Sequence, residues 1–118
     1  MKQAGQLALV EFPFADQAGA KLRPVLLLRP VPGLHADWLV AMISSRLFHA
    51  VPGFDLVLTA ADADFEATGL RVASVIRLGR LAVVGDSLLR GRLGVLQTST
   101  LAEAHARVAS WIAGTRPV

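Results

Sequence analysis

Proline and glycine divide the chain as far as residue 97 into short apolar runs. Runs of this length between turn residues are typical of β-strands. They cover residues 6–12, 23–29, 38–44, 54–58, 72–78, 81–84 and 92–97. Between them we expect a hairpin loop at 14–22, a turn at 30–34, and an irregular loop or single helical turn at 59–68.

The hydrophobic period changes near the C-terminus, where apolar residues recur at helical spacing. They are Leu101, Ala104, Val108, Trp111 and Ile112. This pattern predicts an amphipathic helix with Trp111 in the core. Thr100 and Glu103 have the spacing of a capping box, and Gly114 and Pro117 are helix stop signals. Several short strands followed by one helix predict a mainly β fold, a small barrel with the helix packed on it.

Composition limits the classes of protein and site that remain. The 118 residues, 53% of them hydrophobic, suffice for one core, so we expect a single domain over residues 1–118. Cysteine is absent, which excludes disulfides, a thiolate nucleophile and cysteine-ligated metals. His35, His49 and His105 lack metal-ligand spacing, so we expect surface histidines, no metal and no cofactor. Without a signal peptide or an apolar run of ~20 residues, we expect a cytoplasmic protein that does not enter a membrane.

Positive charge is concentrated in the second half of the chain. Residues 1–66 carry five basic and seven acidic side chains, whereas residues 67–118 carry seven and two. Ten of the twelve basic residues are arginine, whose planar guanidinium matches phosphate. The asymmetry predicts a polyanionic partner, such as nucleic acid or an acidic protein segment. A solvated basic face is the alternative.

A cationic segment lies where a loop leads into an apolar strand. Pro24 restricts the preceding Arg23 to extended conformations, which gives the Arg23 side chain a defined direction. Lys21 precedes Arg23 by two residues. These cations are suited to phosphate, and the alternative is an arginine held in a salt bridge.

Two hydroxyls and a guanidinium follow the end of the next apolar strand. They belong to Ser44, Ser45 and Arg46. Hydroxyls at this position can orient a phosphate or a ribose, and an arginine can clamp one. The alternative is a pair of serines that cap a turn.

Three arginines, Arg71, Arg77 and Arg80, lie within ten residues. Arg71 and Arg77 would share one face of a continuous strand. Together with Ser74, that face could follow a phosphate backbone. The alternative is a charged edge that blocks strand-to-strand aggregation.

Short motifs succeed one another along nearly the whole chain, from about residue 5 to residue 112. In order they are Gly5-Gln6-Leu7, Glu11-Phe12-Pro13-Phe14, Lys21-Leu22-Arg23-Pro24, Ile43-Ser44-Ser45, Pro52-Gly53, Gly69-Leu70, Ser74-Val75-Ile76-Arg77 and Gly94. This succession resembles the MazF/PemK (Kid) toxins of type II toxin–antitoxin modules. The resemblance implies an SH3-like barrel with a C-terminal helix that works as a homodimer. It also implies a metal-independent endoribonuclease that cuts single-stranded RNA at short sequences.

The resemblance further implies a reaction, residue roles and a partner. The ribose 2′-OH is the nucleophile, and the products carry a 2′,3′-cyclic phosphate and a 5′-OH. Arg23 matches a loop arginine that stabilises phosphoryl charge, and Ser44 stands where many members have a phosphate-binding threonine. Arg77 matches an arginine used as general acid or phosphate ligand. The remaining residues expected to bind RNA are Lys21, Ser45, Arg46, Arg71, Ser74 and Arg80. The implied partner is an acidic antitoxin that threads into the RNA groove.

The chain departs from the family pattern at Gly79. Some members carry an acidic residue there, proposed as the general base, and glycine cannot accept a proton. Glu11, Asp16 and His49 are the candidate substitutes. If none of them serves, the protein is a non-catalytic member that binds RNA or an antitoxin.

A third hypothesis concerns the end of the C-terminal helix. Gyrase inhibitors of the CcdB type share this fold and act through residues at that end. Trp111 and Ile112 occupy the corresponding place here, although the helical pattern favours Trp111 as a core residue.

Overall fold

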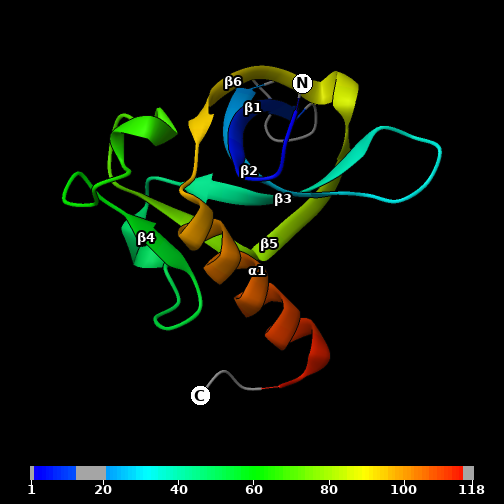
Figure 1. Cartoon of the computed structure of the whole chain (residues 1–118). Coiled ribbons are helices and arrows are strands. Elements are labelled where there is room, and N and C mark those ends of the chain that lie inside the picture. The colour runs from blue at the N-terminus through cyan, green and yellow to red at the C-terminus, as the bar shows by residue number, and fades with distance from the viewer. Residues whose placement is uncertain (1, 13–20, 116–118) are drawn as a thin grey trace.

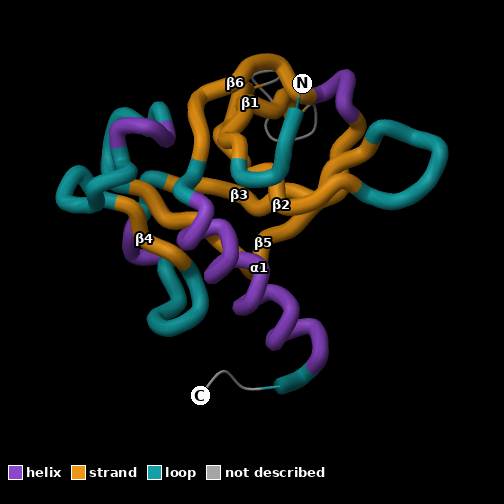
Figure 2. The backbone as a smooth tube through the Cα atoms, viewed as in Figure 1, coloured by secondary structure: helices purple, strands orange, loops and turns teal. Residues whose placement is uncertain are grey.

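The computed structural model describes residues 2–12 and 21–115. This part of the chain forms six strands and one long helix (Figures 1 and 2). The strands are β1 (Gln6–Phe12), β2 (Lys21–Pro30), β3 (Asp37–Ser44), β4 (Leu56–Leu58), β5 (Ser74–Gly85) and β6 (Leu89–Val95). The helix is α1 (Thr98–Ala113), and the 3-10 helices are η1 (Leu47–His49), η2 (Glu66–Thr68) and η3 (Asp86–Leu88). The predicted mainly β fold with a C-terminal helix is confirmed.

All six strands belong to one antiparallel sheet in the order β4-β5-β3-β2-β1-β6. Its central strands are covered on both faces. Leu26 and Leu28 of β2 pack into a core that includes Val108 of α1, whereas Val25 and Leu27 pack into a second core on the other face. Burial on both faces explains why this strand is a continuous apolar run in the sequence rather than an alternating one.

The helix η2 joins the two edges of the sheet. It follows β4, the strand at one edge, and packs against β6, the strand at the other. A Cβ on Gly94 would lie 2.2 Å from the carbonyl oxygen of Ala67, and a Cβ on Gly69 would lie 2.2 Å from that of Leu93. Gly69 also has a φ of +75°, in the left-handed region that favours glycine. These two glycines therefore permit the backbone contact that closes the sheet.

The strand β5 is longer than the sequence predicts. The strands predicted at 72–78 and 81–84 form one strand that pairs with β3 on both sides of a bulge. Met42 lies opposite Arg77, but the preceding residue of β3 lies opposite Leu81. Residues 78–80, which include the glycine that suggested a break, form the bulge and bend the strand.

Asp55 holds this bulge from a neighbouring loop. Its side chain is buried, and its two carboxylate oxygens accept the backbone N–H groups of Leu78 and Val51, each at 2.9 Å. The first of these bonds replaces one that the bulge removes from the ladder. A buried carboxylate is tolerated here because both of its oxygens have donors.

We expect Asp55→Asn to lower the free energy of unfolding by about 2 kcal/mol, because the amide NH₂ would face one of the two buried N–H donors. Asp62→Asn is the matched control. The Asp62 carboxylate also accepts a backbone N–H, from Thr59 at 2.7 Å, but it is exposed to solvent. Urea denaturation followed by tryptophan fluorescence measures both losses, and equal losses would contradict a special role for Asp55.

The start of α1 differs from the prediction. The helix begins at Thr98 with no side-chain cap, so Thr100 and Glu103 lie inside it and the predicted capping box is wrong. Glu103 forms an ion pair within the helix instead. The predicted stop at Gly114 is confirmed by its left-handed conformation, with φ +75°. Pro117 lies outside the described residues.

The prediction that Trp111 belongs to the core is also wrong. Ala104 and Val108 are buried, but Trp111 is 51% exposed and Ile112 is 69% exposed. The last turns of α1 extend past the sheet (Figure 1), so the apolar face continues beyond the surface that could cover it. The Trp111 ring makes an edge contact with Phe54, with the ring centroids 5.7 Å apart.

Several other boundaries differ from the predicted ones, and the strand predicted at 54–58 begins only at Leu56. Lys21 and Leu22, predicted as loop, belong to β2, and residues 14–20 of the predicted hairpin loop lie outside the described residues. The strand β6 begins at Leu89, before the predicted residue 92. Within the described ranges, no helix is long and apolar enough to cross a membrane.

The histidines are less uniformly exposed than predicted. His35 is exposed, but His49 and His105 are partly buried. The Nε2–H of His105 donates to the carbonyl oxygen of Leu28 at 2.7 Å. The β2–β3 register skips Leu28, so this bond attaches α1 to β2 at a bulge.

Candidate active site

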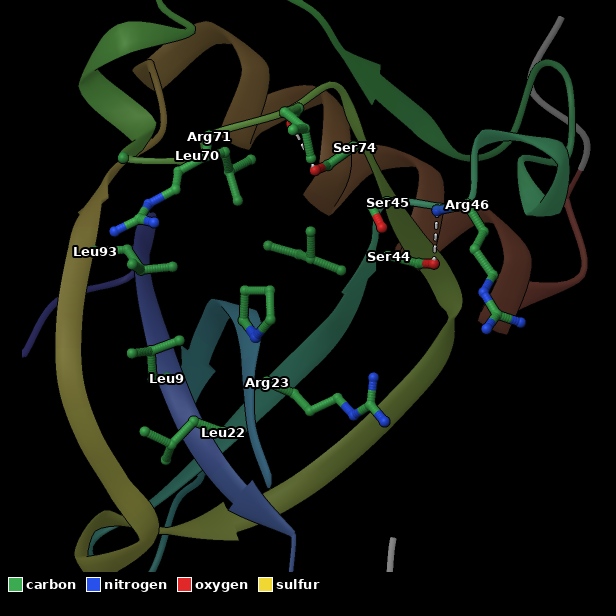
Figure 3. Close-up of a pocket in the computed structure, with 14 residues that line it drawn as sticks. Leu9, Leu22, Arg23, Ser44, Ser45, Arg46, Leu70, Arg71, Ser74 and Leu93 are labelled. Atoms are coloured by element: carbon green, nitrogen blue, oxygen red, sulfur yellow. Dashed lines mark hydrogen bonds between the residues drawn. The ribbon is translucent and has the colours of Figure 1, made fainter. Parts of the chain in front are cut away.

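A pocket of about 360 Å³ opens where β2 and β3 diverge (Figure 3). The pairing of the two strands ends at Val25 and Met42, beyond which β2 pairs only with β1 and β3 only with β5. Pro24 directly precedes Val25, and proline has no N–H to give to a ladder. The proline predicted at the start of this strand thus lies where the sheet opens.

The pocket is lined by apolar and polar side chains from several segments. The apolar lining residues are Leu9, Leu22, Pro24, Ile43, Leu70, Val72 and Leu93. The polar ones are Arg23, Ser44, Ser45, Arg46, Arg71 and Ser74. Six of the nine residues that the sequence assigns to the site therefore surround one pocket.

The three lining arginines are available to an anion. Figure 3 shows the guanidinium of Arg23 on the side of Ser44 and Arg46, whereas Arg71 lies across the pocket near Leu93. All three arginines are exposed. None of their guanidinium groups has an ion pair or hydrogen bond to another residue within 2–12 or 21–115. The salt bridge considered for Arg23 is therefore not formed with any of these residues.

Ser44 ends β3 with its hydroxyl held in a turn. Its Oγ accepts the backbone N–H of Arg46 at 3.1 Å (Figure 3). This is the turn-capping arrangement considered from the sequence. The bond fixes the oxygen and leaves the O–H able to donate to a ligand. Ser45, which is exposed, lines the same pocket.

Ser74 and Arg71 line the pocket in ways that the sequence does not predict. Ser74 is buried, and its O–H donates to the carbonyl oxygen of Val72 at 2.9 Å. Its proton is therefore used within the protein. Arg71 precedes β5, so the shared strand face expected for Arg71 and Arg77 does not form.

Three predicted site residues are described in the structure but do not line the pocket. Lys21 is exposed at the first position of β2, and Arg80 is exposed in the β5 bulge. Arg77 is partly buried, and its Nε is buried with no hydrogen-bond partner among the described residues. Arg77 nevertheless lies opposite Met42, two residues before Ser44 on β3.

Among the described residues, none that lines the pocket is a carboxylate or a histidine. Glu11 forms an ion pair with an arginine of β6 at 3.2 Å, and His49 belongs to η1. Asp16 lies outside the described residues, and Gly79 lies in the β5 bulge. None of the candidate general bases within the described ranges therefore lines the pocket.

The apolar part of the pocket was missed by sequence analysis. Leucine and isoleucine in strands are usually core residues, so their pattern does not distinguish a pocket wall from the interior. The available signal was the pair Gly69 and Gly94. Their backbone contact holds β6 against the segment that precedes β5, and so places Leu93 and Leu70 around one pocket.

Comparison with known proteins identifies the family. The family of PemK-like, MazF-like toxins of type II toxin–antitoxin systems matches residues 3–112. The structure of the Mycobacterium tuberculosis toxin MazF-mt6 is similar, with a TM-score of 0.63 and 20% identity over 95% of this chain and 99% of that one. An endoribonuclease in complex with its cognate antitoxin, from a mycobacterial species, has a TM-score of 0.68 and 14% identity over 99% of this chain and 100% of that one. No curated protein matches. Because the family match covers most of its length, the chain belongs to the PemK-like, MazF-like toxin family of type II toxin–antitoxin systems.

Proposed function

We propose that this protein is a toxin that cleaves single-stranded RNA in the pocket between β2 and β3. The observation that carries the proposal is that Arg23, Ser44 and Arg46 lie on one side of a pocket whose described lining includes no carboxylate. A phosphate there would meet guanidinium and hydroxyl donors. The apolar lining suits an unstacked base or the carbon atoms of ribose. Membership of the toxin family and similarity to a protein described as an endoribonuclease support the proposal.

The proposed reaction is an attack within the RNA strand. The 2′-oxygen of a ribose loses its proton and bonds to the adjacent phosphorus. The bond from phosphorus to the 5′-oxygen breaks, and that oxygen gains a proton. The products carry a 2′,3′-cyclic phosphate and a 5′-OH. Negative charge grows on the non-bridging oxygens, and we assign its stabilisation to Arg23 and the Ser44 O–H.

Proton transfer is assigned to water because the described lining has no carboxylate or histidine. Catalysis then depends on positioning the 2′-OH in line with the leaving oxygen and on stabilising phosphoryl charge. Arg77 lies opposite Met42, two residues before Ser44 on β3, and we keep for it the role of phosphate ligand that the resemblance implies.

Digestion of a mixed-sequence RNA in EDTA tests the proposal. We expect fragments with 5′-OH ends, which polynucleotide kinase labels without prior phosphatase treatment. An RNA with 2′-deoxyribose at the cleaved position should remain intact. Salt-dependent binding without cleavage of any RNA would overturn the proposal. It would instead support the non-catalytic alternative raised by Gly79.

We infer an acidic antitoxin as the protein partner. An extended acidic segment would meet Arg23, Arg46 and Arg71, whose guanidinium groups pair with no described residue, and would compete with RNA for the pocket. The similar mycobacterial endoribonuclease was solved with its cognate antitoxin, which supports this inference. Both partners are expected in the cytoplasm.

We also infer a homodimer that forms through the end of α1. Trp111 and Ile112 of α1 are each more than half exposed, and so are Phe48 and Val51 in the segment that leads to Phe54. We call these four side chains the Trp111 surface. Phe54 adjoins it through the ring contact with Trp111. A group of aromatic and aliphatic side chains of this kind is typical of an interface rather than of a solvated surface.

Trp111→Ala should raise the dimer dissociation constant at least about 30-fold, because a tryptophan at the centre of an interface commonly contributes about 2 kcal/mol or more. Analytical ultracentrifugation over a concentration series measures the constant. Val83→Ala is the control, since Val83 is 59% exposed on β5 and lies outside the Trp111 surface. A dimer unchanged by Trp111→Ala would place the interface elsewhere.

The exposure of Trp111 and Ile112 also favours a second candidate function, inhibition of DNA gyrase. Supercoiling of relaxed plasmid by gyrase separates the two functions. The ribonuclease proposal predicts full supercoiling in the presence of the protein. Inhibition that Trp111→Ala abolishes would support the gyrase alternative.

A further inference from the structure

Among the described residues, no strand pairs with the outer side of β4. This strand pairs with β5 through Leu56–Leu58 and lies at the edge of the sheet. In an antiparallel ladder, alternate residues turn their N–H and C=O groups away from the partner strand. These outward groups are available to another extended chain.

A groove runs between this strand and the first turns of α1. It has a volume of about 300 Å³, and all three residues of β4 line it. Asp62 and Asp64 line it from the loop after β4, and Ser99, Thr100 and Glu103 line it from α1. We call this space the β4 groove. It shares no lining residue with the pocket between β2 and β3.

The β4 groove is acidic in a chain whose net charge is +3. Among the described residues, no lysine or arginine lines it. Asp62 accepts the Thr59 N–H at 2.7 Å, and Glu103 pairs with Arg107 at 2.7 Å. Asp64, by contrast, has a buried Oδ2 with no hydrogen-bond partner within 2–12 or 21–115. Asp64 is only partly buried as a residue and has no ion pair with a described residue, so a cationic group of a bound chain would neutralise its carboxylate.

We propose that the β4 groove binds an extended peptide with basic side chains, which adds as a strand to β4. Main-chain bonds to the outward groups of β4 supply affinity, and a lysine or arginine of the peptide pairs with Asp64. The short strand limits the number of main-chain bonds, so the contact is of the weak, reversible kind. The proposal does not depend on RNA cleavage, because the two sites have no residue in common.

Titration with a short, end-blocked peptide of alternating lysine and valine tests the proposal. Nuclear magnetic resonance should show shifts at the amides of Leu56–Leu58, together with slower hydrogen exchange at those that point outward. A peptide with glutamate in place of lysine should bind at least about tenfold more weakly. Methylation of alternate peptide nitrogens should abolish binding, because it removes the N–H donors of the added strand.

Asp64→Asn should weaken binding of the lysine peptide at least about fivefold. Its thermal midpoint should not fall, because the buried Oδ2 has no partner to lose. Glu66→Gln is the matched control, an exposed acidic residue close in sequence that does not line the groove. The proposal is overturned if no peptide binds, if the β4 amides do not respond, or if the control weakens binding as much as Asp64→Asn.

Discussion

Arg23→Ala should slow RNA cleavage about 10²–10³-fold while leaving the fold intact, which is the usual effect of removing one preorganised donor from a developing oxyanion. The fold should survive because Arg23 is exposed and makes no bond to another residue within 2–12 or 21–115. Arg23→Lys should reduce the cleavage rate less than Arg23→Ala does, since an ammonium keeps the charge but not the planar fork of donors. Single-turnover cleavage of a labelled RNA gives the rate for each variant.

Arg29→Ala is the matched control for charge. Arg29 lies on the same strand and is exposed, but it does not line the pocket. The Arg29→Ala variant should therefore cleave RNA at close to the wild-type rate. Binding of a 2′-deoxy substrate analogue should be weakened less by Arg23→Ala than the cleavage rate is, because transition-state charge exceeds ground-state charge. Equal loss in the two alanine variants would show that only the net charge of the protein matters.

Sequence reasoning predicted those parts of the site that depend on local chemistry. Pro24 lacks an N–H wherever it occurs, so it signals the edge or the entry of a strand. Ser44 and Ser45 follow an apolar run, so they signal hydroxyls at the end of a strand. Both signals come from adjacent residues, and the structure brings Arg23, Ser44 and Arg46 to one pocket.

The parts that could not be predicted depend on residues distant in the sequence. The bulge that joins the two halves of β5 is supported by Asp55, 23 positions before Leu78. Helical periodicity gives the face on which Trp111 lies, but not the point where the sheet beneath that face ends. Arg71 and Arg77 have strand-like spacing, but β5 begins between them. In each case tertiary contacts decide the outcome.

Gly94→Ala should lower the free energy of unfolding by about 3 kcal/mol or more, because its Cβ would overlap backbone rather than a movable side chain. The Cβ would lie 2.2 Å from the carbonyl oxygen of Ala67 and 2.5 Å from the carbonyl carbon of Thr68. To remove this steric overlap, β6 and η2 must separate, and their separation opens the contact between the two edges of the sheet. Leu93 and Leu70 would then move apart, so RNA cleavage should fall even at temperatures where the variant is folded.

Gly91→Ala in the same strand separates this steric effect from the general effect of replacing glycine. The nearest heavy atom to its Cβ, Cδ1 of Leu9, is 4.0 Å away, so the free energy of unfolding should change by less than about 1 kcal/mol. Urea denaturation followed by tryptophan fluorescence measures the free energy of unfolding of both variants.

Gly69→Ala adds a double-mutant cycle, since Gly69 and Gly94 serve the same backbone contact. Once one alanine has separated η2 from β6, the second has less to displace, so the combined loss should be smaller than the sum of the single losses. Additive losses would mean that the two glycines act independently, and that the edges of the sheet are not joined through this contact.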